Sequence, residues 1–478
     1  MIDYSQLYKD FISKPKSLLI APAGCGKTYT IAECLKYTGG TQLVLTHTHA
    51  GVAAIKEKVK KSGIDSNKYY IETIDSFAQK YVNAFYCKND IPPQENNNRY
   101  FPFIIKQATR IVKIKPIKDI IKITYSGLFV DEYQDCTKTQ HLFVMALSNI
   151  IPVHLLGDHL QGIFYFREEL MDWKTDLNEF ANACFKLTEP WRWKNTNPQL
   201  GNRLKEIRNK LENEESIDLK LFESDIEILL IEEKDIYIPY KEYYKRICNL
   251  LDTESSLLLI HPNSQNFNAR KKIIKNFKNR IYLLEAMDGK DFYNYSKDFD
   301  NSDSGTIYRI IYKIICNIFN KTELNKWFNR NSLKNKRNDK DKIIIAPIKA
   351  NMDKLNQSIS FILVSKILKQ IKNIPNVICY RKELFYNLCK ALEQAEYQNI
   401  SVYEAMKNIR NVKRRIGRKI EGKCIGTTLL TKGLEFDTVA ILNAHKFNCP
   451  KNLYVALTRA SKKLIIFTTK VVLSPYNN

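Results

Sequence analysis

Short apolar runs alternate with amphipathic helical patterns through the first third of the chain. Helical patterns at residues 27–37 and 50–60 each follow an apolar run. The runs themselves are the length of strands and predict buried strands at residues 17–20, 42–45, 127–130 and 153–156. Strands that alternate with helices form a parallel sheet covered by helices. We therefore expect an α/β domain here.

The alternation returns later in the chain and is then interrupted. It runs from residue 226 to about residue 284, with its clearest strand at residues 256–260. Residues 285–420 lack it and are predicted to be mostly helical. Strands return at residues 423–427, 438–442 and 463–468. We expect these last strands to rejoin the earlier sheet, which makes the helical block an insertion.

A smaller interruption lies in the first domain. A polar loop at residues 91–98 precedes a basic amphipathic stretch, which predicts a small helical insertion. The chain thus divides into two α/β domains, each split by an insertion. The expected ranges are 1–87 and 126–215 for the first domain with its insertion at 88–125, and 216–284 and 421–478 for the second with its insertion at 285–420.

Composition narrows the class of protein. A chain of 478 residues with 44% hydrophobic residues can bury more than one core. Its net charge of +24 favours a polyanionic partner such as nucleic acid, although an organism that overuses lysine gives the same balance. The eleven cysteines form no Cys-x-x-Cys pair, and no apolar stretch approaches the ~18 residues of a membrane span. We expect a soluble cytoplasmic protein with no membrane contact.

A phosphate-binding loop is predicted between the first strand and the first helix. The segment from Ala21 to Thr28 places small residues there, although Ala21 stands where the strict pattern has glycine. Backbone N–H groups at a helix N-terminus bind phosphate. Lys27 is expected to reach the β- and γ-phosphates and Thr28 to hold Mg²⁺. The residues expected to wrap the phosphate chain are Ala23, Gly24, Cys25 and Gly26.

Two carboxylates follow the strand at residues 127–130. Ligands bind at the carboxyl ends of strands in open parallel sheets. We predict that Asp131 holds Mg²⁺ and that Glu132 orients and deprotonates the attacking water. Together with the phosphate loop, this predicts nucleotide hydrolysis with Mg²⁺.

Further segments follow in a fixed order, and their pattern resembles the UvrD/Rep/PcrA group of superfamily 1 helicases. The segments are Asp131-Glu132-Tyr133-Gln134-Asp135, Gly157-Asp158-His159-Leu160-Gln161 with its continuation to Arg167, Leu187 with Trp191-Arg192, Lys432-Gly433-Leu434-Glu435-Phe436-Asp437, and Leu453-Tyr454-Val455-Ala456-Leu457-Thr458-Arg459-Ala460. The resemblance implies two RecA-like P-loop domains with parallel sheets and mostly helical insertions. It also implies an ATP-dependent DNA helicase that moves 3′ to 5′.

The resemblance assigns roles around the γ-phosphate. Gln161 is expected to sense the γ-phosphate and to couple its loss to the DNA-contacting loop. Arg192 and Arg459 are expected to place guanidinium groups on it from the second domain. Such groups stabilise the charge that spreads over the transition state.

Around the nucleoside, the resemblance implies stacking and hydrogen bonding. Trp191 is expected to stack on adenine, and Tyr29, where the family often has arginine, offers a second ring. Gly433 and Glu435 are expected to bind the nucleotide, with Glu435 in contact with the ribose. Gln6 lies 21 residues before Lys27, at the spacing of the family's adenine-reading glutamine, although a solvated helical glutamine fits equally.

The resemblance also implies contacts to single-stranded DNA. Hydroxyl groups bond phosphates, and aromatic rings stack on bases of any sequence. The expected contacts are Thr46, His47, Thr48, Thr73, Ser76, Phe77, Phe164, Phe166 and Thr427, with core packing as the alternative for Phe164 and Phe166. Two family histidines are replaced here, by Asp75 and Leu429. These changes put strand coupling in question more than ATP hydrolysis.

Several functions fit these segments. The first is a DNA helicase that acts on single-stranded DNA, with duplex DNA as a further candidate partner. The second is a DNA-sensing ATPase subunit with a nuclease partner protein, because compact chains of this kind resemble the helicase-like subunits of anti-phage systems such as Gabija, which accompany an OLD-type nuclease. A nuclease built on Asp225 and Glu232-Glu233-Lys234 and a non-hydrolysing binding module are weaker alternatives.

Overall fold

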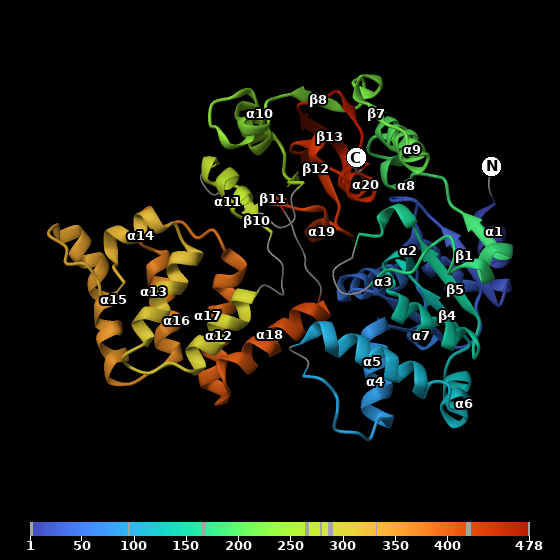
Figure 1. The fold of residues 1–478 in the computed structure, drawn as a ribbon, viewed down its shortest axis with the longest axis horizontal. Helices are drawn as coiled ribbons and strands as arrows, with labels where there is room; N and C mark the ends of the chain where they lie inside the picture. The colour runs from blue at the N-terminus through green and yellow to red at the C-terminus, as the bar shows by residue number, and fades with distance from the viewer. Residues whose placement is uncertain are drawn as a thin grey trace.

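The computed structural model describes residues 3–93, 96–163, 169–262, 267–277, 280–284, 290–330, 332–416 and 422–476. Two six-stranded sheets organise the chain, with strand orders β3-β2-β4-β5-β1-β6 and β10-β11-β9-β12-β13-β8 (Figure 1). Neighbouring strands in both sheets are parallel. The predicted fold class, two α/β domains of the RecA-like type, is therefore confirmed.

The first sheet brings three loop-bearing strands together. Its strands are β1 (Lys16–Ile20), β2 (Gln42–Thr46), β3 (Tyr69–Thr73), β4 (Gly127–Val130), β5 (Val153–Gly157) and β6 (Cys184–Lys186). Its main helices are α1 (Tyr4–Ser13), α2 (Lys27–Tyr37), α3 (His49–Lys61), α4 (Ile74–Phe85) and α7 (Lys138–Ser148). Every residue of β4 and β5 is buried, as expected for strands covered on both faces. Because β4, β5 and β1 are neighbours, the loops after them meet at one edge.

The second sheet is assembled from two separate parts of the chain. Its strands are β8 (Glu227–Leu230), β9 (Leu257–Ile260), β10 (Tyr282–Leu283), β11 (Lys423–Gly426), β12 (Phe436–Ile441) and β13 (Ala460–Thr468). Strand β9 lies between β11 and β12, so the C-terminal strands rejoin the earlier sheet as the pattern predicted. Helices α10 (Glu242–Thr253), α11 (Phe267–Asn276), α19 (Thr428–Thr431) and α20 (Pro450–Leu457) accompany it. A short antiparallel pair joins β7 (Ile217–Asp218) to β14 (Val472–Leu473).

The junction between the two domains differs from the expected one. Helices α8 (Trp191–Lys194) and α9 (Pro198–Glu212) contact β13 and α20 of the second domain. Trp193 and Leu204 are buried in the same cluster as Val439 and Ile441 of the second sheet. The sequence placed these helices in the first domain, up to residue 215, because helical periodicity shows an apolar face but not which sheet that face covers. Packing favours a boundary between β6 and α8.

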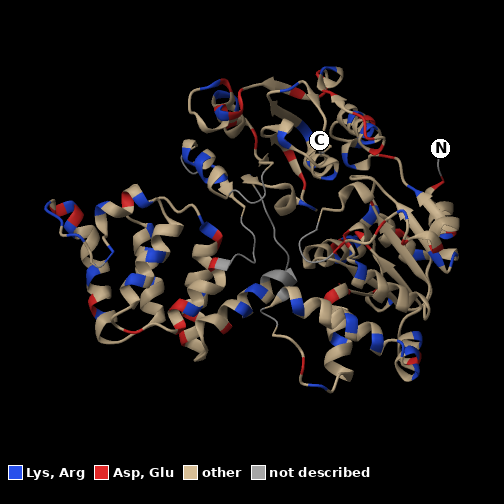
Figure 2. Cartoon of the chain, viewed as in Figure 1, with Lys and Arg blue, Asp and Glu red and all other residues tan. Residues whose placement is uncertain are grey.

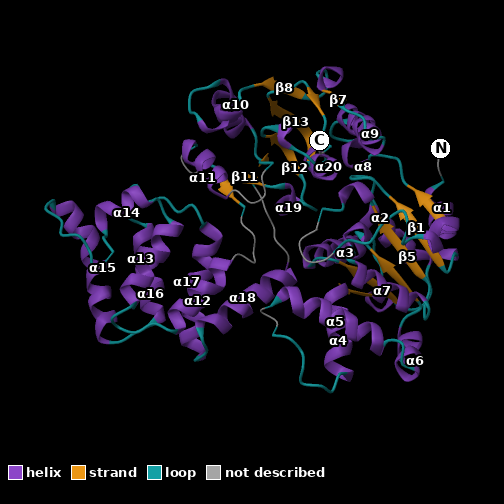
Figure 3. Cartoon of the chain, in the orientation of Figure 1, coloured by secondary structure: helices purple, strands orange, loops and turns teal. Residues whose placement is uncertain are grey.

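Both insertions are helical. The small one contains α5 (Asn97–Ile111) and α6 (Lys115–Thr124). The large one contains α12 (Lys290–Asp300), α13 (Ile307–Ile318), α14 (Lys321–Trp327), α15 (Asp339–Gln357), α16 (Phe361–Lys372), α17 (Lys382–Gln398) and α18 (Val402–Ile416). It has a core of its own and lies apart from the strands (Figure 3).

Helix α18 links the large insertion to the first domain, because it packs on both α12 and α3. Lysine and arginine recur along α5, α6 and α18 (Figure 2). Within the described part of the chain, no helix has the length and hydrophobicity needed to cross a membrane.

Candidate active site

The phosphate loop connects β1 to α2. Gly24 and Gly26 have φ values of +74° and +88°, which residues with a β-carbon rarely adopt. A β-carbon at Gly24 would also lie 2.5 Å from the Cζ3 atom of Trp193, so only glycine fits against α8. The backbone N–H of Arg192 donates to the Gly24 carbonyl at 3.0 Å, which fixes the loop against the second domain. Helix α2 begins at Lys27, so its N-terminus faces the loop.

The two predicted carboxylates lie at the carboxyl end of β4. Glu132 has a φ of 55°, a left-handed conformation that is uncommon outside glycine and is found at functional sites. Burial, and then the charge of Glu132, raise the pKa of Asp131 to about 7. Burial acts in the same direction on Glu132, but Lys27 and Lys432 outweigh it and the pKa of Glu132 lies below its usual value. Glu132 is therefore the carboxylate that stays ionised at neutral pH.

The residues fit a magnesium ion that bridges to phosphate. The Thr28 hydroxyl hydrogen-bonds the Asp131 carboxylate, so two oxygen ligands lie together at the start of α2. Mg²⁺ takes oxygen ligands and is held by one or two protein groups plus phosphate oxygens. Lys27 is close by, with its Nζ atom 3.8 Å from Oε1 of Glu132.

Two arginines enter from the second domain. Arg192 donates to the Thr458 carbonyl at 2.5 Å, and its Nε atom lies 2.8 Å from Oε2 of Glu435. Arg459 is 2% exposed and donates to the carbonyls of Val455 at 2.9 Å and Leu434 at 3.0 Å. Burial, and then repulsion by Arg192, lower the pKa of Arg459 to about 9, so its guanidinium is charged at neutral pH.

Lys432 bridges the two domains on the other side of the cleft. Its ammonium group lies 2.5 Å from Oδ2 of Asp135 and also donates to the Gln161 carbonyl. The Gln161 side chain donates to Oδ2 of Asp158 at 2.7 Å. Lys432 was not predicted as a site residue from the sequence, although Lys432 directly precedes Gly433 in the segment that resembles the helicase family.

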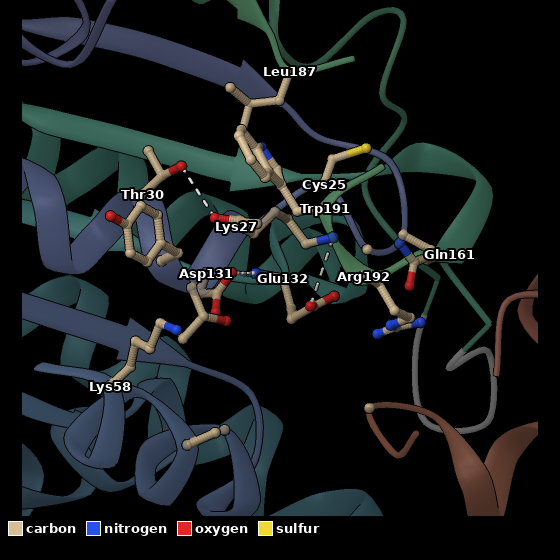
Figure 4. A pocket seen from close by; sticks show the side chains of 18 of the residues that line it. Cys25, Lys27, Thr30, Lys58, Asp131, Glu132, Gln161, Leu187, Trp191 and Arg192 are labelled. Carbon is tan, nitrogen blue, oxygen red and sulfur yellow. Dashed lines mark hydrogen bonds and ion pairs between the residues drawn. The ribbon is translucent and has the colours of Figure 1, made fainter. Parts of the chain in front are cut away.

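All six predicted catalytic residues line one pocket of about 950 Å³ between the two domains (Figure 4). They are Lys27, Asp131, Glu132, Gln161, Arg192 and Arg459. The predicted nucleotide-binding residues that also line it are Ala23, Gly24, Cys25, Gly26, Thr28, Tyr29, Trp191, Gly433 and Glu435. Loops of both sheets therefore build a single site.

Aromatic side chains also line the pocket. Trp191 and Tyr29 line it and are 42% and 44% exposed, so both rings are accessible. Tyr4 contacts Trp191 edge to face, with ring centroids 5.7 Å apart. The sequence did not single out Tyr4 and Tyr8, whose spacing of four residues places both on the same face of α1.

The structure places Gln6 outside the nucleotide pocket. Its side-chain amide donates to Oδ1 of Asp10 at 2.8 Å, and Gln6 is exposed outside the pocket. Tyr4, Ser5 and Tyr8 of α1 line the pocket instead. At 100° per residue these three lie on one side of the helix and Gln6 on the other. The spacing to Lys27 does not show which way the side chain points, and α1 turns Gln6 away from the pocket.

Comparisons with known proteins agree with this architecture. Residues 6–167 match the family described as AAA domain, and residues 376–468 match the viral superfamily 1 RNA helicase core domain. The chain is similar to an ATP-dependent helicase/nuclease subunit of Lactococcus lactis subsp. cremoris (strain SK11), at 26% identity over 39% of the chain and 14% of that protein. It is also similar to the exonuclease/helicase subunit RexA of L. lactis subsp. cremoris (strain MG1363), at 31% identity over 25% of the chain and 10% of that protein.

The chain belongs to the superfamily 1 helicases. The matches to the two lactococcal subunits cover only about a seventh and a tenth of those proteins. The matched families fall on the two sheets of this helicase, one on each side of the nucleotide pocket.

The residues expected to contact DNA separate into three groups. Thr46, the last residue of β2, and His47 and Thr48, which follow it, line the nucleotide pocket together with Glu132. Thr73 and Ser76 line a second cavity and bond each other, with their hydroxyl oxygens 2.8 Å apart. Phe164 and Phe166 lie outside the described residues.

Two of the expected DNA contacts are contradicted by burial. Phe77 is 0% exposed and packs among Tyr81, Tyr125 and Phe143, so no base can stack on it. Thr427 is 1% exposed at the start of α19, and its carbonyl accepts from Thr431. Phe77 packs inside the first domain and Thr427 inside the second.

The second cavity is an open groove of about 830 Å³ beside edge strand β3. Helices α3 and α4 border it, with Lys56 and Lys80 as its cations and Gln79 and Asn83 as its amides. The Nζ atom of Lys80 lies 4.7 Å from the centre of the Tyr70 ring, and Tyr70 also lines the groove. Hydroxyls, amides and lysines suit a phosphate backbone without base specificity.

The residues of the weaker nuclease alternative form ion pairs with lysine or arginine. Asp225 lies 2.8 Å from Nε of Arg203, Glu232 lies 3.2 Å from Lys234, and Glu233 contacts Lys446. In the part of the chain that the structure describes, no cluster of three His, Cys, Asp or Glu residues is placed to hold a metal ion. The geometry gives this alternative no support.

Proposed function

We propose that this chain hydrolyses ATP to move along single-stranded DNA in the 3′ to 5′ direction and to separate the strands of a duplex. The observation that carries the proposal is that one pocket is lined from both domains. Lys27, Asp131 and Glu132 come from the first sheet, and Arg192 and Arg459 come from the second core. A bound γ-phosphate draws such groups together, and its loss lets the domains separate, which supplies a stepping motion.

The residues of the pocket divide the chemistry of hydrolysis. Glu132 is ionised, so it accepts a proton from water as the water oxygen bonds to the γ-phosphorus and the bond to ADP breaks. Lys27, Arg192 and Arg459 stabilise the negative charge on the phosphoryl oxygens. Mg²⁺, held by Thr28 and Asp131, would neutralise further charge on the β- and γ-phosphates.

Helix α3 supports coupling between hydrolysis and strand movement. Ala50, Ala54 and Lys58 line the nucleotide pocket from one face of this helix. His49, Val52 and Lys56 line the groove beside β3 from another face. A shift of α3 on nucleotide binding would move one wall of the groove, so the groove is the proposed track for DNA.

The decisive test is the rate of ATP hydrolysis with and without single-stranded DNA, for the wild type and for Glu132→Gln. We expect strong stimulation by DNA in the wild type and a loss of at least ~10³-fold in the variant, because the base is removed. A duplex with a 3′ single-stranded tail should be unwound and one with a 5′ tail should not. A rate of ATP hydrolysis that single-stranded DNA does not change would contradict the proposed movement along DNA.

A second candidate function is a DNA-sensing ATPase subunit of an anti-phage complex with an OLD-type nuclease. Both lactococcal relatives are named as subunits that combine helicase with nuclease or exonuclease, which favours a nuclease partner. Asp75, which replaces a family histidine, accepts a hydrogen bond from Gln140 at 2.8 Å inside the first domain. Strong unwinding by the purified chain alone would count against this candidate.

A further inference from the structure

A buried polar network joins the two domains next to the phosphate loop. Its centre is Arg208 of α9, which is 5% exposed. The NH1 atom of Arg208 lies 2.8 Å from Oδ1 of Asp158 and donates to the Tyr454 hydroxyl at 3.0 Å. Its NH2 atom donates to Oε1 of Glu212 at 2.7 Å. These contacts fix the orientation of the guanidinium.

The network reaches the γ-phosphate machinery at two points. Asp158 uses its other oxygen, Oδ2, to accept from the Gln161 side chain at 2.7 Å. The Tyr454 hydroxyl accepts from the backbone N–H of Ala23, in the phosphate loop, at 3.2 Å. Ala23 and Gln161 follow strands of the first sheet, whereas Arg208 and Tyr454 belong to helices of the second core.

Burial prevents the groups of this network from replacing their partners with water. Asp158 is 0% exposed and Tyr454 is 2% exposed, so neither group can exchange its partner for bulk water. A buried charge that loses its partner is strongly destabilised. Without Arg208, the buried Asp158 carboxylate would lose its ion-pair partner, and Gln161 would lose an acceptor that is held in place. None of the motif segments of the sequence contains Arg208.

We propose that Arg208 and Tyr454 are positioning residues, which set Gln161 and the phosphate loop for recognition of the γ-phosphate according to the position of the second domain. They do not touch the nucleotide pocket, so they act through Asp158, Gln161 and Ala23. The inference rests on the proposed function for the role of Gln161. It adds a physical link by which movement of α9 and α20 changes the discrimination between ATP and ADP.

The test is the ratio of the affinities for a non-hydrolysable ATP analogue and for ADP. It is measured by competition against a fluorescent nucleotide for the wild type, Arg208→Gln and Tyr454→Phe. We expect Arg208→Gln to lower this ratio about 10-fold, within the range of ordinary coupling between sites, with the Kd for ADP little changed. Tyr454→Phe keeps the ring and loses the hydroxyl, so its ratio should fall less, about 3-fold.

Hydrolysis gives a second readout. Arg208→Gln should lower kcat about 10²-fold, as the loss of one transition-state donor does, while KM for ATP changes little. The double variant Asp158→Asn with Arg208→Gln should be no slower than Arg208→Gln alone, because both changes break the same pair. Arg203→Gln on the same helix is the matched control, since Arg203 pairs with Asp225 and Glu206 instead.

Three outcomes would overturn the proposal. They are equal losses of affinity for the analogue and for ADP in both variants, a wild-type ratio in Arg208→Gln, and additive losses in the double variant. Tyr454→Phe keeps the test valid if Arg208→Gln is too unstable to purify. The affinity ratio needs no DNA, so a wild type that DNA does not stimulate would remove the proposed motor and leave this test unaffected.

Discussion

The phosphate end and the base end of the nucleotide pocket differ in how far their side chains are buried and held in place. At the phosphate end, the side chains are held by a loop, by strand ends and by buried partners, and Lys27 and Asp131 are 8% and 3% exposed. At the base end, the walls are exposed rings, with Trp191 42% and Tyr29 44% exposed. The phosphate end has the rigid geometry that charge stabilisation needs, whereas the base end offers faces on which a ring can stack.

Because the two ends differ in this way, we expect them to affect different kinetic constants. Groups that act on the developing charge of the transition state change kcat, and groups that bind the ground state and the transition state alike change KM. We therefore expect substitutions at the phosphate end to lower kcat and substitutions at the base end to raise KM. A substitution that breaks this division would show that the two ends are coupled.

The largest effect should come from Lys27→Ala. The Nζ atom of Lys27 lies 3.8 Å from Oε1 of Glu132, and Lys27 is nearly buried. We expect ATP hydrolysis to fall by at least about 10³-fold, because a preorganised charge is lost from a site with little water. Much of the affinity for single-stranded DNA should remain, because Lys56, Lys80 and Tyr70 of the groove are untouched.

Salt dependence of the remaining affinity is the control for Lys27→Ala. The logarithm of the binding constant should fall with the logarithm of salt at a slope of about −0.7 per phosphate contacted, equally in the wild type and the variant. Loss of DNA binding with intact hydrolysis would contradict the assignment of both sites.

The next effect should come from Arg459→Lys. The Arg459 guanidinium is aimed by the carbonyls of Val455 and Leu434, a forked geometry that an ammonium group cannot reproduce. We expect kcat to fall about 10²-fold with KM for ATP changed less than about 3-fold. Steady-state kinetics at saturating single-stranded DNA would measure both. An unchanged kcat would mean that the second domain does not complete the site.

The features of the phosphate end that follow from the chain path could be predicted from the sequence. Strands β4 and β5 are continuous apolar runs, so the strand ends and the carboxylates Asp131 and Glu132 could be predicted from the pattern, whereas Gln161 was predicted from the family resemblance. The phosphate loop is held between β1 and α2, so its side chains follow from the chain path. The insertion in the second domain could be predicted because helical periodicity replaces the alternation over more than a hundred residues.

Other features depend on tertiary contacts that the sequence does not show. Strand β3 was missed because the run Tyr69–Thr73 mixes apolar and polar residues at the edge of the sheet. The burial of Phe77 depends on α7, whose Phe143 packs against it. Arg208 is one of several cations on α9, a helix that the sequence assigned to the first domain and that contacts β13 and α20. Its role needs Asp158 and Tyr454, which are distant in sequence.

A smaller effect, on affinity alone, should come from Trp191→Ala. Stacking on an aromatic ring contributes about 1–3 kcal/mol per base, so KM for ATP should rise roughly 10-fold. The value of kcat at saturating ATP should change little, because a stacking ring binds the ground state and the transition state alike. Trp191→Phe retains a stacking face and serves as the control. A fall in kcat for Trp191→Ala would indicate that the ring also positions its neighbour Arg192.

The smallest effect should come from Gln6→Ala, which tests the base end most sharply. A site that reads a base through a buried hydrogen-bonding side chain rejects an analogue that lacks the partner group by about 10⁴–10⁵-fold. Gln6 cannot act in this way here, because it is exposed, bonds Asp10 and lies on the far side of α1 from the pocket.

We therefore expect Gln6→Ala to change kcat/KM for ATP by less than about 2-fold, within the usual range for a solvated surface substitution. The ratio of kcat/KM for ATP to that for GTP should be the same in the variant and the wild type. Parallel steady-state assays with the two nucleotides measure both quantities. A fall in kcat/KM for ATP with no change for GTP would mean that α1 rotates when nucleotide binds and brings Gln6 to the base. The base end would then hold its ligand by a fixed hydrogen bond, as the phosphate end does by fixed charges.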